Sequence, residues 1–386
     1  MDNKTSLEDM RPYRDDEVRN VIKRLEKDQQ MVHILKFINP DCEIEEIMNK
    51  FKNINTIEEF QNVFSSKAVE YLINTTTDGL TYNGLENLNT NETYLFIANH
   101  RDIVMDSAIM QWLLKVHGFR TSQITFGSNL MYSQFIIDLG KMNKMFTFYR
   151  SNTKIGTYRN ALLHSKYIRQ VIIEQHQSIW IAQHDGRTKD GNDYTQAALI
   201  KMLLFKQNDL FKALKELNIV PVVVSYEKEP CDVYKLKEIY NKKVHGGKYT
   251  KSENEDLTSI LNGITSQKGR VHMSFGKPVN NFLNEVSHSK LELDKIANLV
   301  AMFIDKEVFR NYKLYPYNYI AFDVKHESTI FLDKQYSAND IDKFNSFLLL
   351  KMTSEKCDKD IPRDIFERMF LNMYAAPVEN YLKLEN

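Results

Sequence analysis

Residues 93–116 read TYLFIANHRDIVMDSAIMQWLLKV, and this stretch decides the fold. The apolar run 94–98 has the length and composition of a strand, and the crowded apolar residues after Asp106 indicate a largely buried helix. His100 stands among the polar residues between them, at the exit of the strand. Open α/β sheets bind ligands in the crevice beyond the carboxyl ends of their strands. The stretch therefore predicts an α/β sheet and the edge at which its chemistry lies.

The polar residues of this stretch can supply a general base and its carboxylate. A neutral imidazole takes a proton from an attacking hydroxyl when a carboxylate holds its other nitrogen in one tautomer. His100 is the candidate base and Asp106 the candidate carboxylate, with Asp102 as the alternative partner. Either aspartate could instead only cap the helix or interact with its dipole. The residues of the stretch leave both interpretations open.

Strand-like and helix-like segments alternate from residue 93 to residue 285. The strand candidates are 94–98, 123–126, 145–149, 178–182, 219–226 and 271–275, and the helical stretches include 158–176 and 195–217. This alternation predicts a central, mostly parallel or mixed sheet covered by helices. The strand candidate that contains VPVVVSY is nearly continuous and rich in β-branched residues, which suits a strand buried on both faces.

The chain on either side of this domain reads as helical. Residues 1–92 contain a capping box at Thr56, and the polar tract 74–92 reads as a connector to the first strand. Residues 286–386 read as helices around an aromatic connector, FRNYKLYPYNYIAF, which we expect to pack this extension onto its neighbour. The predicted organisation is an N-terminal helical region (1–92), an α/β domain (93–285) and a C-terminal helical extension (286–386).

Composition narrows the class of protein. Among 386 residues, Lys+Arg and Asp+Glu are both 51, so net charge gives no sign of a nucleic-acid partner. Cys42, Cys231 and Cys357 show neither a disulfide framework nor metal-ligand spacing, which indicates reduced thiols in a cytoplasmic protein. The first residues are polar rather than signal-like, and the longest apolar runs fall short of the roughly 20 residues that span a bilayer. A lipid substrate would therefore be met from outside the membrane.

Five motifs, in order, resemble those of the glycerolipid acyltransferases. NHRDIVMDSAIM resembles the family's first motif, in which a His and an Asp precede an apolar helix. The remaining blocks are GSNLM with MFTFYR, then HDGRTKDG, then IVPVVVSYEKEP, and finally GRVHMSFGKPV. Together they span roughly residues 90–285, about half of the chain. The likeness is greatest to the glycerol-3-phosphate acyltransferase branch.

The resemblance implies a role for each matching residue. His100 would remove the hydroxyl proton, and Asp106 would orient the His100 ring. Arg150 and Arg187 would bind the acceptor phosphate, and each also follows a predicted strand, where a guanidinium can hold a phosphate bidentately. Gly186 would let the backbone come close to the ligand, and Lys189 would add a positive charge. The full predicted substrate-binding set is Arg101, Arg150, Asp185, Gly186, Arg187, Lys189 and Pro221.

Two departures from the family pattern bear on these roles. Five residues, rather than four, separate His100 from Asp106, so the two side chains could not share a face of a regular helix. His100 must lie in the loop before the helix, or a one-residue bulge must absorb the extra residue. In the third block, either Asp185 is the acid of the family's Glu-Gly-x-Arg, or His184 stands in its place.

The predicted function is an O-acyltransferase for phospholipid synthesis. An acyl thioester of CoA or acyl carrier protein would donate to glycerol 3-phosphate or its monoacyl derivative, without a metal or another cofactor. The protein would be cytoplasmic and peripheral on the inner face of the membrane. The alternatives are a non-catalytic lipid- or phosphate-binding protein on the same scaffold, and an acyltransferase for a hydroxy- or amino-lipid acceptor. A serine hydrolase is disfavoured because the chain lacks G-x-S-x-G.

Overall fold

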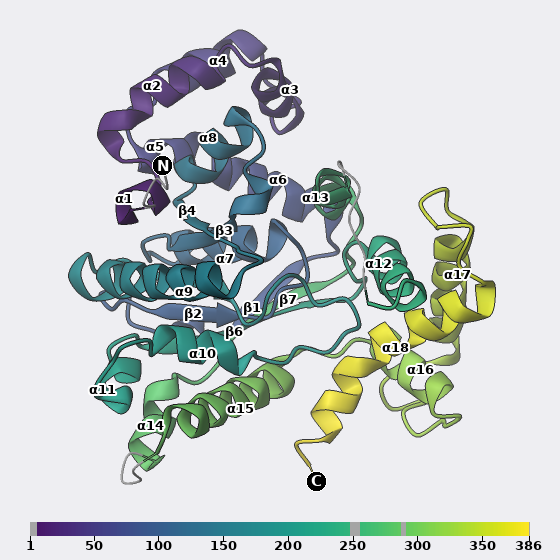
Figure 1. Cartoon of the computed structure of the whole chain (residues 1–386). Helices are drawn as coiled ribbons and strands as arrows, with labels where there is room; N and C mark the ends of the chain where they lie inside the picture. The colour runs from purple at the N-terminus through teal and green to yellow at the C-terminus, as the bar shows by residue number, and fades with distance from the viewer. Residues whose placement is uncertain (1–5, 248–254, 287–290, 386) are drawn as a thin grey trace.

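The computed structural model describes residues 6–247, 255–286 and 291–385, and its centre is a sheet (Figure 1). The strands are β1 (Leu80–Asn83), β2 (Leu95–Ala98), β3 (Gln123–Gly127), β4 (Met145–Phe148), β5 (Ile179–Ala182), β6 (Ile219–Tyr226) and β7 (Val271–Phe275). They lie in the order β1-β7-β6-β2-β5-β3-β4. Strands β2 to β6 are parallel, whereas β7 is antiparallel to β6 and parallel to β1. The predicted α/β class with a mixed sheet is confirmed.

All six predicted strands are present, and the sheet has one strand that the sequence did not predict. Residues 74–92 were expected to be a connector, but β1 lies within them and pairs with β7, with Leu80 opposite Val271. The expectation was wrong because β1 has only four residues, and most of them are exposed. Such a short, exposed edge strand has little apolar patterning, and its partner lies far away in the sequence.

The alternation of side chains along the strands divides the core into two layers. In β2, Leu95 and Ile97 face one layer, and Phe96 and Ala98 face the other. Helices α9, α10, α11, α14 and α15 cover the first face, and α7 with part of α6 covers the second. Their bounds are α7 (Met105–Val116), α9 (Lys154–Arg169), α10 (Ala197–Leu203), α11 (Leu210–Lys215), α14 (Val279–Val286) and α15 (Leu293–Asn311).

The N-terminal region is helical, as predicted, and packs on the sheet domain through α8. Its helices are α1 (Leu7–Met10), α2 (Asp15–Leu25), α3 (Gln29–Phe37), α4 (Ile44–Lys52), α5 (Ile57–Phe60) and α6 (Ser66–Thr76), with α8 at Gln134–Met142. The capping box at Thr56 is confirmed, because its hydroxyl accepts a 3.1 Å hydrogen bond from the Glu59 amide. Tyr13 and Arg24 both bond to the buried carboxylate of Asp138 on α8, which fixes the region against the domain.

The C-terminal helices form a further core with a helix of the central region. They are α16 (Pro316–Lys325), α17 (Ala338–Thr353) and α18 (Arg363–Leu382), and they pack with α12 (Asp232–Val244), close to α13 (Glu255–Thr265). The aromatic connector packs inward as expected, since Tyr312, Tyr315 and Tyr317 are all buried.

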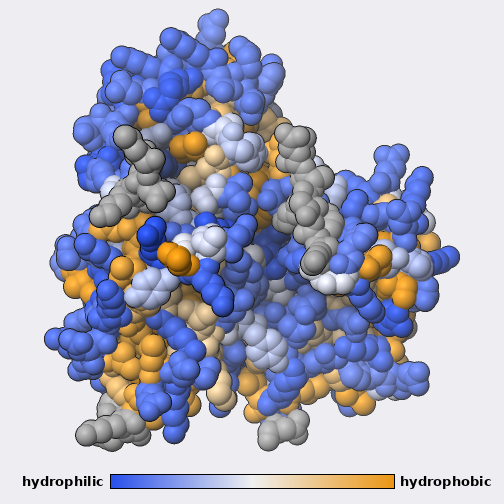
Figure 2. Space-filling view, viewed as in Figure 1, coloured by the Kyte–Doolittle hydropathy of each residue, from blue (hydrophilic) through white to orange (hydrophobic). Residues whose placement is uncertain are grey.

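The surface differs between these parts of the molecule. In Figure 2 the N-terminal helices at the top and the C-terminal helices at the right present mostly hydrophilic side chains, whereas hydrophobic ones gather at the lower left, over α10, α11 and α14. Within the described residues, no helix combines the length and the apolar content needed to cross a bilayer.

Candidate active site

The five parallel strands end at one edge of the sheet, which we call the carboxyl edge. His100 follows β2, Arg150 follows β4 and His184 follows β5, while Tyr226 closes β6. Strand β6 reaches further than β2, since Ala98, the last residue of β2, pairs with Val222. The chemistry-bearing residues of four distant segments are thereby brought to one edge, as open α/β sheets require.

His100 and Asp106 are in contact at this edge. Nδ1 of His100 lies 2.9 Å from Oδ2 of Asp106. Since an ionised carboxylate only accepts hydrogen bonds, Nδ1 carries the proton and Nε2 is the nitrogen that can accept one. The His100 side chain is 15% exposed, and its ring meets the Trp180 ring edge-on at a centroid distance of 5.5 Å. The imidazole is therefore oriented on one side and accessible on the other.

The loop 99–104 explains how the extra residue between the pair is accommodated. His100 lies in this loop, ahead of α7, and Asp106 is the second residue of α7. The Asp106 side chain turns back toward the loop, where Oδ2 also accepts the backbone N–H groups of Arg101 at 2.6 Å and Asp102 at 2.8 Å. Of the two possibilities stated above, the structure shows the histidine in the loop rather than a bulge in the helix.

Tyr226 is a further hydrogen-bond donor to Asp106, and the sequence analysis did not predict this role for it. Its hydroxyl donates to Oδ1 of Asp106 at 2.8 Å. Burial, reinforced by the neighbouring Asp106 carboxylate, raises the pKa of Tyr226 well above its usual value, so the hydroxyl remains a donor. The signal was available, because a polar aromatic residue ends the strand run VPVVVSY at the edge where His100 was expected.

Asp102, the alternative partner of the histidine, caps α7 instead. Its Oδ1 accepts the backbone N–H groups of Val104 at 2.9 Å and Met105 at 2.8 Å. Its Oδ2 faces α13, where a Cβ placed on Gly263 would lie only 2.0 Å away. The carboxylate is thus held between two helices, and the structure pairs His100 with Asp106.

Arg150 and Asp185 meet at the surface of the carboxyl edge. Nη2 of Arg150 lies 2.7 Å from Oδ1 of Asp185, and the two side chains are 48% and 70% exposed. An ion pair this exposed contributes little to stability, so an anionic ligand can replace the carboxylate at the guanidinium. The pair brings together two of the predicted substrate-binding residues from separate strands.

Arg187 is buried and incompletely paired. The residue is 9% exposed, and its buried Nη1 has no hydrogen-bond partner among the described residues. A buried guanidinium nitrogen without an acceptor is costly, and an anion would satisfy it. Gly186 beside it has a φ of +74°, a conformation that glycine adopts without strain, and the space that a Cβ would occupy is open.

The His184 ring bonds within its own loop. Its Nε2 lies 3.0 Å from the Thr188 hydroxyl, and its Nδ1 lies 3.2 Å from the Asp185 carbonyl oxygen. Burial lowers the pKa of His184, which favours a neutral ring at neutral pH. The carboxylate of Asp185, rather than the His184 ring, is the group that meets Arg150.

The structure corrects the role expected of Arg101. Its side chain is 1% exposed, and its guanidinium bonds to Asp193 at 2.6 Å and to Glu229 at 3.0 Å. Burial alone would lower the pKa of Arg101, but these two carboxylates outweigh it and raise that pKa well above its usual value. The guanidinium is enclosed in an internal ion-pair cluster and is not free to bind substrate.

Lys189 and Pro221, which were also expected to contact substrate, both have partners within the protein. Nζ of Lys189 pairs with Glu238 on α12 at 2.6 Å. Pro221 is buried inside β6 opposite Ile97, and its carbonyl oxygen accepts the Gly276 amide at 2.8 Å. Sequence position within a motif did not reveal these partners, because each comes from a different segment of the chain.

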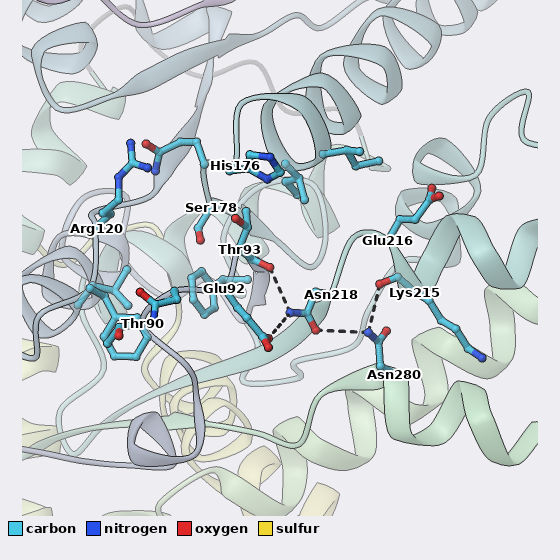
Figure 3. Close-up of a pocket in the computed structure, with 17 residues that line it drawn as sticks. Thr90, Glu92, Thr93, Arg120, His176, Ser178, Lys215, Glu216, Asn218 and Asn280 are labelled. Carbon is cyan, nitrogen blue, oxygen red and sulfur yellow. Dashed lines mark hydrogen bonds between the residues drawn. The ribbon is translucent and has the colours of Figure 1, made fainter.

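A pocket of about 690 Å³ lies at the opposite edge of the sheet (Figure 3). Residues that precede the strands line it, among them Thr93 before β2 and Ser178 before β5. Asn218, before β6, donates to the Glu92 carboxylate and to the Thr93 carbonyl oxygen, both at 3.2 Å. This pocket contains none of the residues gathered at the carboxyl edge, which remains the candidate site.

Comparison with known proteins agrees with the sequence motifs at the level of the family. Residues 79–225 match the family model described as Acyltransferase, a range that contains His100, Asp106, Arg150 and Arg187. The match supports an acyltransferase and does not distinguish the glycerol-3-phosphate branch. It ends before β7 and the C-terminal helices.

Two further comparisons add little. A search of curated protein sequences finds no match. The crystal structure of the 1-acyl-sn-glycerophosphate (LPA) acyltransferase PlsC from Thermotoga maritima is similar over 75% of this chain and 95% of its own. The sequence identity is 15% and the TM-score is 0.33, so this similarity bears on neither activity nor substrate.

Proposed function

We propose that the protein is an O-acyltransferase that moves a fatty acyl group from an acyl thioester to a hydroxyl of glycerol 3-phosphate or 1-acylglycerol 3-phosphate. The donor would be acyl-CoA or acyl carrier protein. The observation that carries the proposal is the contact between His100 and Asp106 at the carboxyl edge, within the region that matches the acyltransferase family. The partly unpaired guanidinium of Arg187 supports an anionic acceptor.

The geometry suits a direct transfer. Nε2 of His100 takes the proton of the acceptor hydroxyl as its oxygen attacks the thioester carbonyl carbon. The new C–O bond forms a tetrahedral intermediate, which collapses by breaking the C–S bond. The proton held by His100 then passes to the departing thiolate. Asp106 keeps Nδ1 protonated and stabilises the imidazolium during the step. No acyl-enzyme intermediate is required.

The two arginines would hold the acceptor phosphate. Arg187 has a buried nitrogen with no partner in the described part of the chain, and Arg150 has an exposed ion pair that a phosphate can displace. Guanidinium groups bind phosphate through two parallel hydrogen bonds, which fixes the position of the ligand as well as its charge. A phosphate fixed in this way would also place the neighbouring hydroxyl for attack.

The first test concerns the base and its carboxylate. His100→Ala should lower kcat by roughly 10²–10⁴, the usual contribution of general-base catalysis. Asp106→Asn should cost about as much as the roughly 10⁴ seen for a mis-set tautomer in an analogous pair. Asp102→Asn should be mild, because an amide oxygen can still cap α7. Initial rates with acyl-CoA and acyl carrier protein donors measure all three.

This test needs a control for folding. Each variant is first shown to unfold cooperatively near the temperature of the wild type. A folded His100→Ala protein with near-wild-type turnover would reject the base assignment. A wild type that binds phospholipid but never turns over a thioester would favour the non-catalytic binding protein instead.

The second test concerns the phosphate. Arg187→Lys and Arg150→Lys should each raise the KM for the acceptor about tenfold and leave the KM for the donor unchanged, because lysine cannot reproduce the bidentate geometry. Asp185→Asn is the matched control, since it removes the carboxylate that competes for Arg150 and should lower the acceptor KM. Unchanged acceptor kinetics in both lysine variants, or a preference for phosphate-free acceptors, would move the acceptor to a hydroxy- or amino-lipid.

We further propose that the protein works at the surface of an anionic membrane, as a peripheral protein on its cytoplasmic side. The first turns of α9, next to Arg150, expose Ile155 at 68% and Tyr158 at 54%. Lys154 and Arg159 are exposed beside them, and the sequence has no acidic residue from 139 to 173. Apolar side chains flanked by basic ones suit an anionic lipid surface.

This surface is tested by vesicle binding. Ile155→Asp should weaken cosedimentation with phosphatidylglycerol-containing vesicles about tenfold, because it removes an inserted apolar group and adds a repelled charge. Val116→Asp is the control, since Val116 is 51% exposed at the other edge of the sheet. An equal loss of vesicle binding in both variants, or no loss of binding in Ile155→Asp, would place the membrane contact elsewhere.

A further inference from the structure

Helix α18 lies directly against the loop that carries Arg187. Gly191 in this loop has a φ of +87°, and a Cβ placed on it would lie 2.2 Å from the Met373 carbonyl oxygen on α18. Only glycine therefore allows the helix and the loop to approach so closely. Asn380, further along α18, bonds to Asn192 and Tyr194 of the same loop, at 3.4 Å in each case.

A buried cluster of charges lies between this helix and the candidate site. Arg101 bonds to Asp193 and Glu229, and Glu229 also bonds to Lys235, a residue with no exposed side-chain surface. The two cations and two carboxylates balance. Removing one partner from such a cluster leaves an uncompensated charge in the interior, so its geometry is strongly determined.

Tyr374 connects α18 to this cluster. The backbone N–H of Glu229 donates to the Tyr374 oxygen at 2.8 Å, and the Tyr374 hydroxyl lies 3.5 Å from Oδ2 of Asp232. Asp232 in turn pairs with Lys351 of α17 at 2.9 Å. Tyr374 is itself buried. A hydroxyl of the C-terminal helices thus holds the backbone of Glu229, whose carboxylate bonds to Arg101 and Lys235.

The cluster ends at the candidate general base. Arg101, whose side chain bonds to Glu229, donates its backbone N–H to Asp106 at 2.6 Å, and Asp106 holds His100. The Thr188 amide, three residues before Gly191, donates to the His100 carbonyl oxygen at 2.7 Å. Two chains of contacts therefore connect α18 to His100, one through Glu229 and Arg101 and the other through the loop that contains Thr188 and Gly191.

From these contacts we propose that α18 is a positioning element of the active site. Tyr374, acting through Glu229 and Arg101, fixes the backbone N–H groups that hold the Asp106 carboxylate, and Asp106 orients His100. The inference rests on the proposed function where it concerns catalysis. The effect on the Arg101 and Asp102 amides does not depend on that function. The effect on catalysis and the effect on these amides can therefore be tested separately.

The experiment compares Tyr374→Phe with Tyr381→Phe, a change on the same helix at a residue that is 36% exposed. Tyr374→Phe removes one hydroxyl, so the fold should persist, and this is checked by the thermal midpoint. Amide hydrogen exchange at Arg101 and Asp102 should then quicken about three- to tenfold, and kcat should fall by a similar factor, with the KM for the donor unchanged. Tyr381→Phe should change neither quantity.

Gly191→Ala supplies an independent perturbation of the same contact. Its Cβ would force α18 and the loop apart, so it should speed exchange at the same two amides although Tyr374 keeps its hydroxyl. The proposal is overturned if Tyr374→Phe leaves both local exchange and kcat at wild-type values, whether or not the thermal midpoint changes. If the wild type shows no acyl transfer, the proposed function fails, and the exchange data alone still decide whether α18 positions the loop.

Discussion

The carboxylate of Asp106 is the point on which the candidate site depends. It accepts hydrogen bonds from the His100 ring, the Arg101 and Asp102 amides and the Tyr226 hydroxyl, and its side chain is 2% exposed. A buried carboxylate is costly unless its oxygens are satisfied, and here four donors satisfy them. Because three of the donors come from one short loop, the same bonds fix the shape of that loop and the direction of the imidazole.

The fold supplies the Tyr226 donor by extending β6 past its neighbour β2. Beyond the end of β2, the Asn99 side chain continues the pairing with β6, accepting the Val224 amide at 2.8 Å and donating to the Val224 carbonyl oxygen at 3.0 Å. Strand β6 can therefore run on to Tyr226, above the loop that holds His100. The other side of the loop is fixed by Arg101, whose ion pairs lead to the C-terminal helices.

The sequence predicted what depends on local pattern. Apolar periodicity located six strands, and the strand exit located His100, Asp106 and Arg150 at one edge. Local pattern failed for β1, whose four residues carry little patterning, and for Arg101, whose partner Glu229 lies far along the chain. It also did not reveal that Lys189 pairs with Glu238. A charged residue beside a motif can bind substrate or close an internal ion pair. Only the tertiary structure distinguishes the two, because the partner comes from a segment that the motif does not include.

The central claim is that Asp106 holds His100 in a single tautomer with Nε2 free to accept a proton. Nitrogen-15 NMR of histidine-labelled protein, at a pH where His100 is neutral, measures this directly, with His100→Gln used to assign its signals. The account predicts a protonated Nδ1 and an unprotonated Nε2. A dominant Nε2–H tautomer, or an equal mixture of the two, would contradict it.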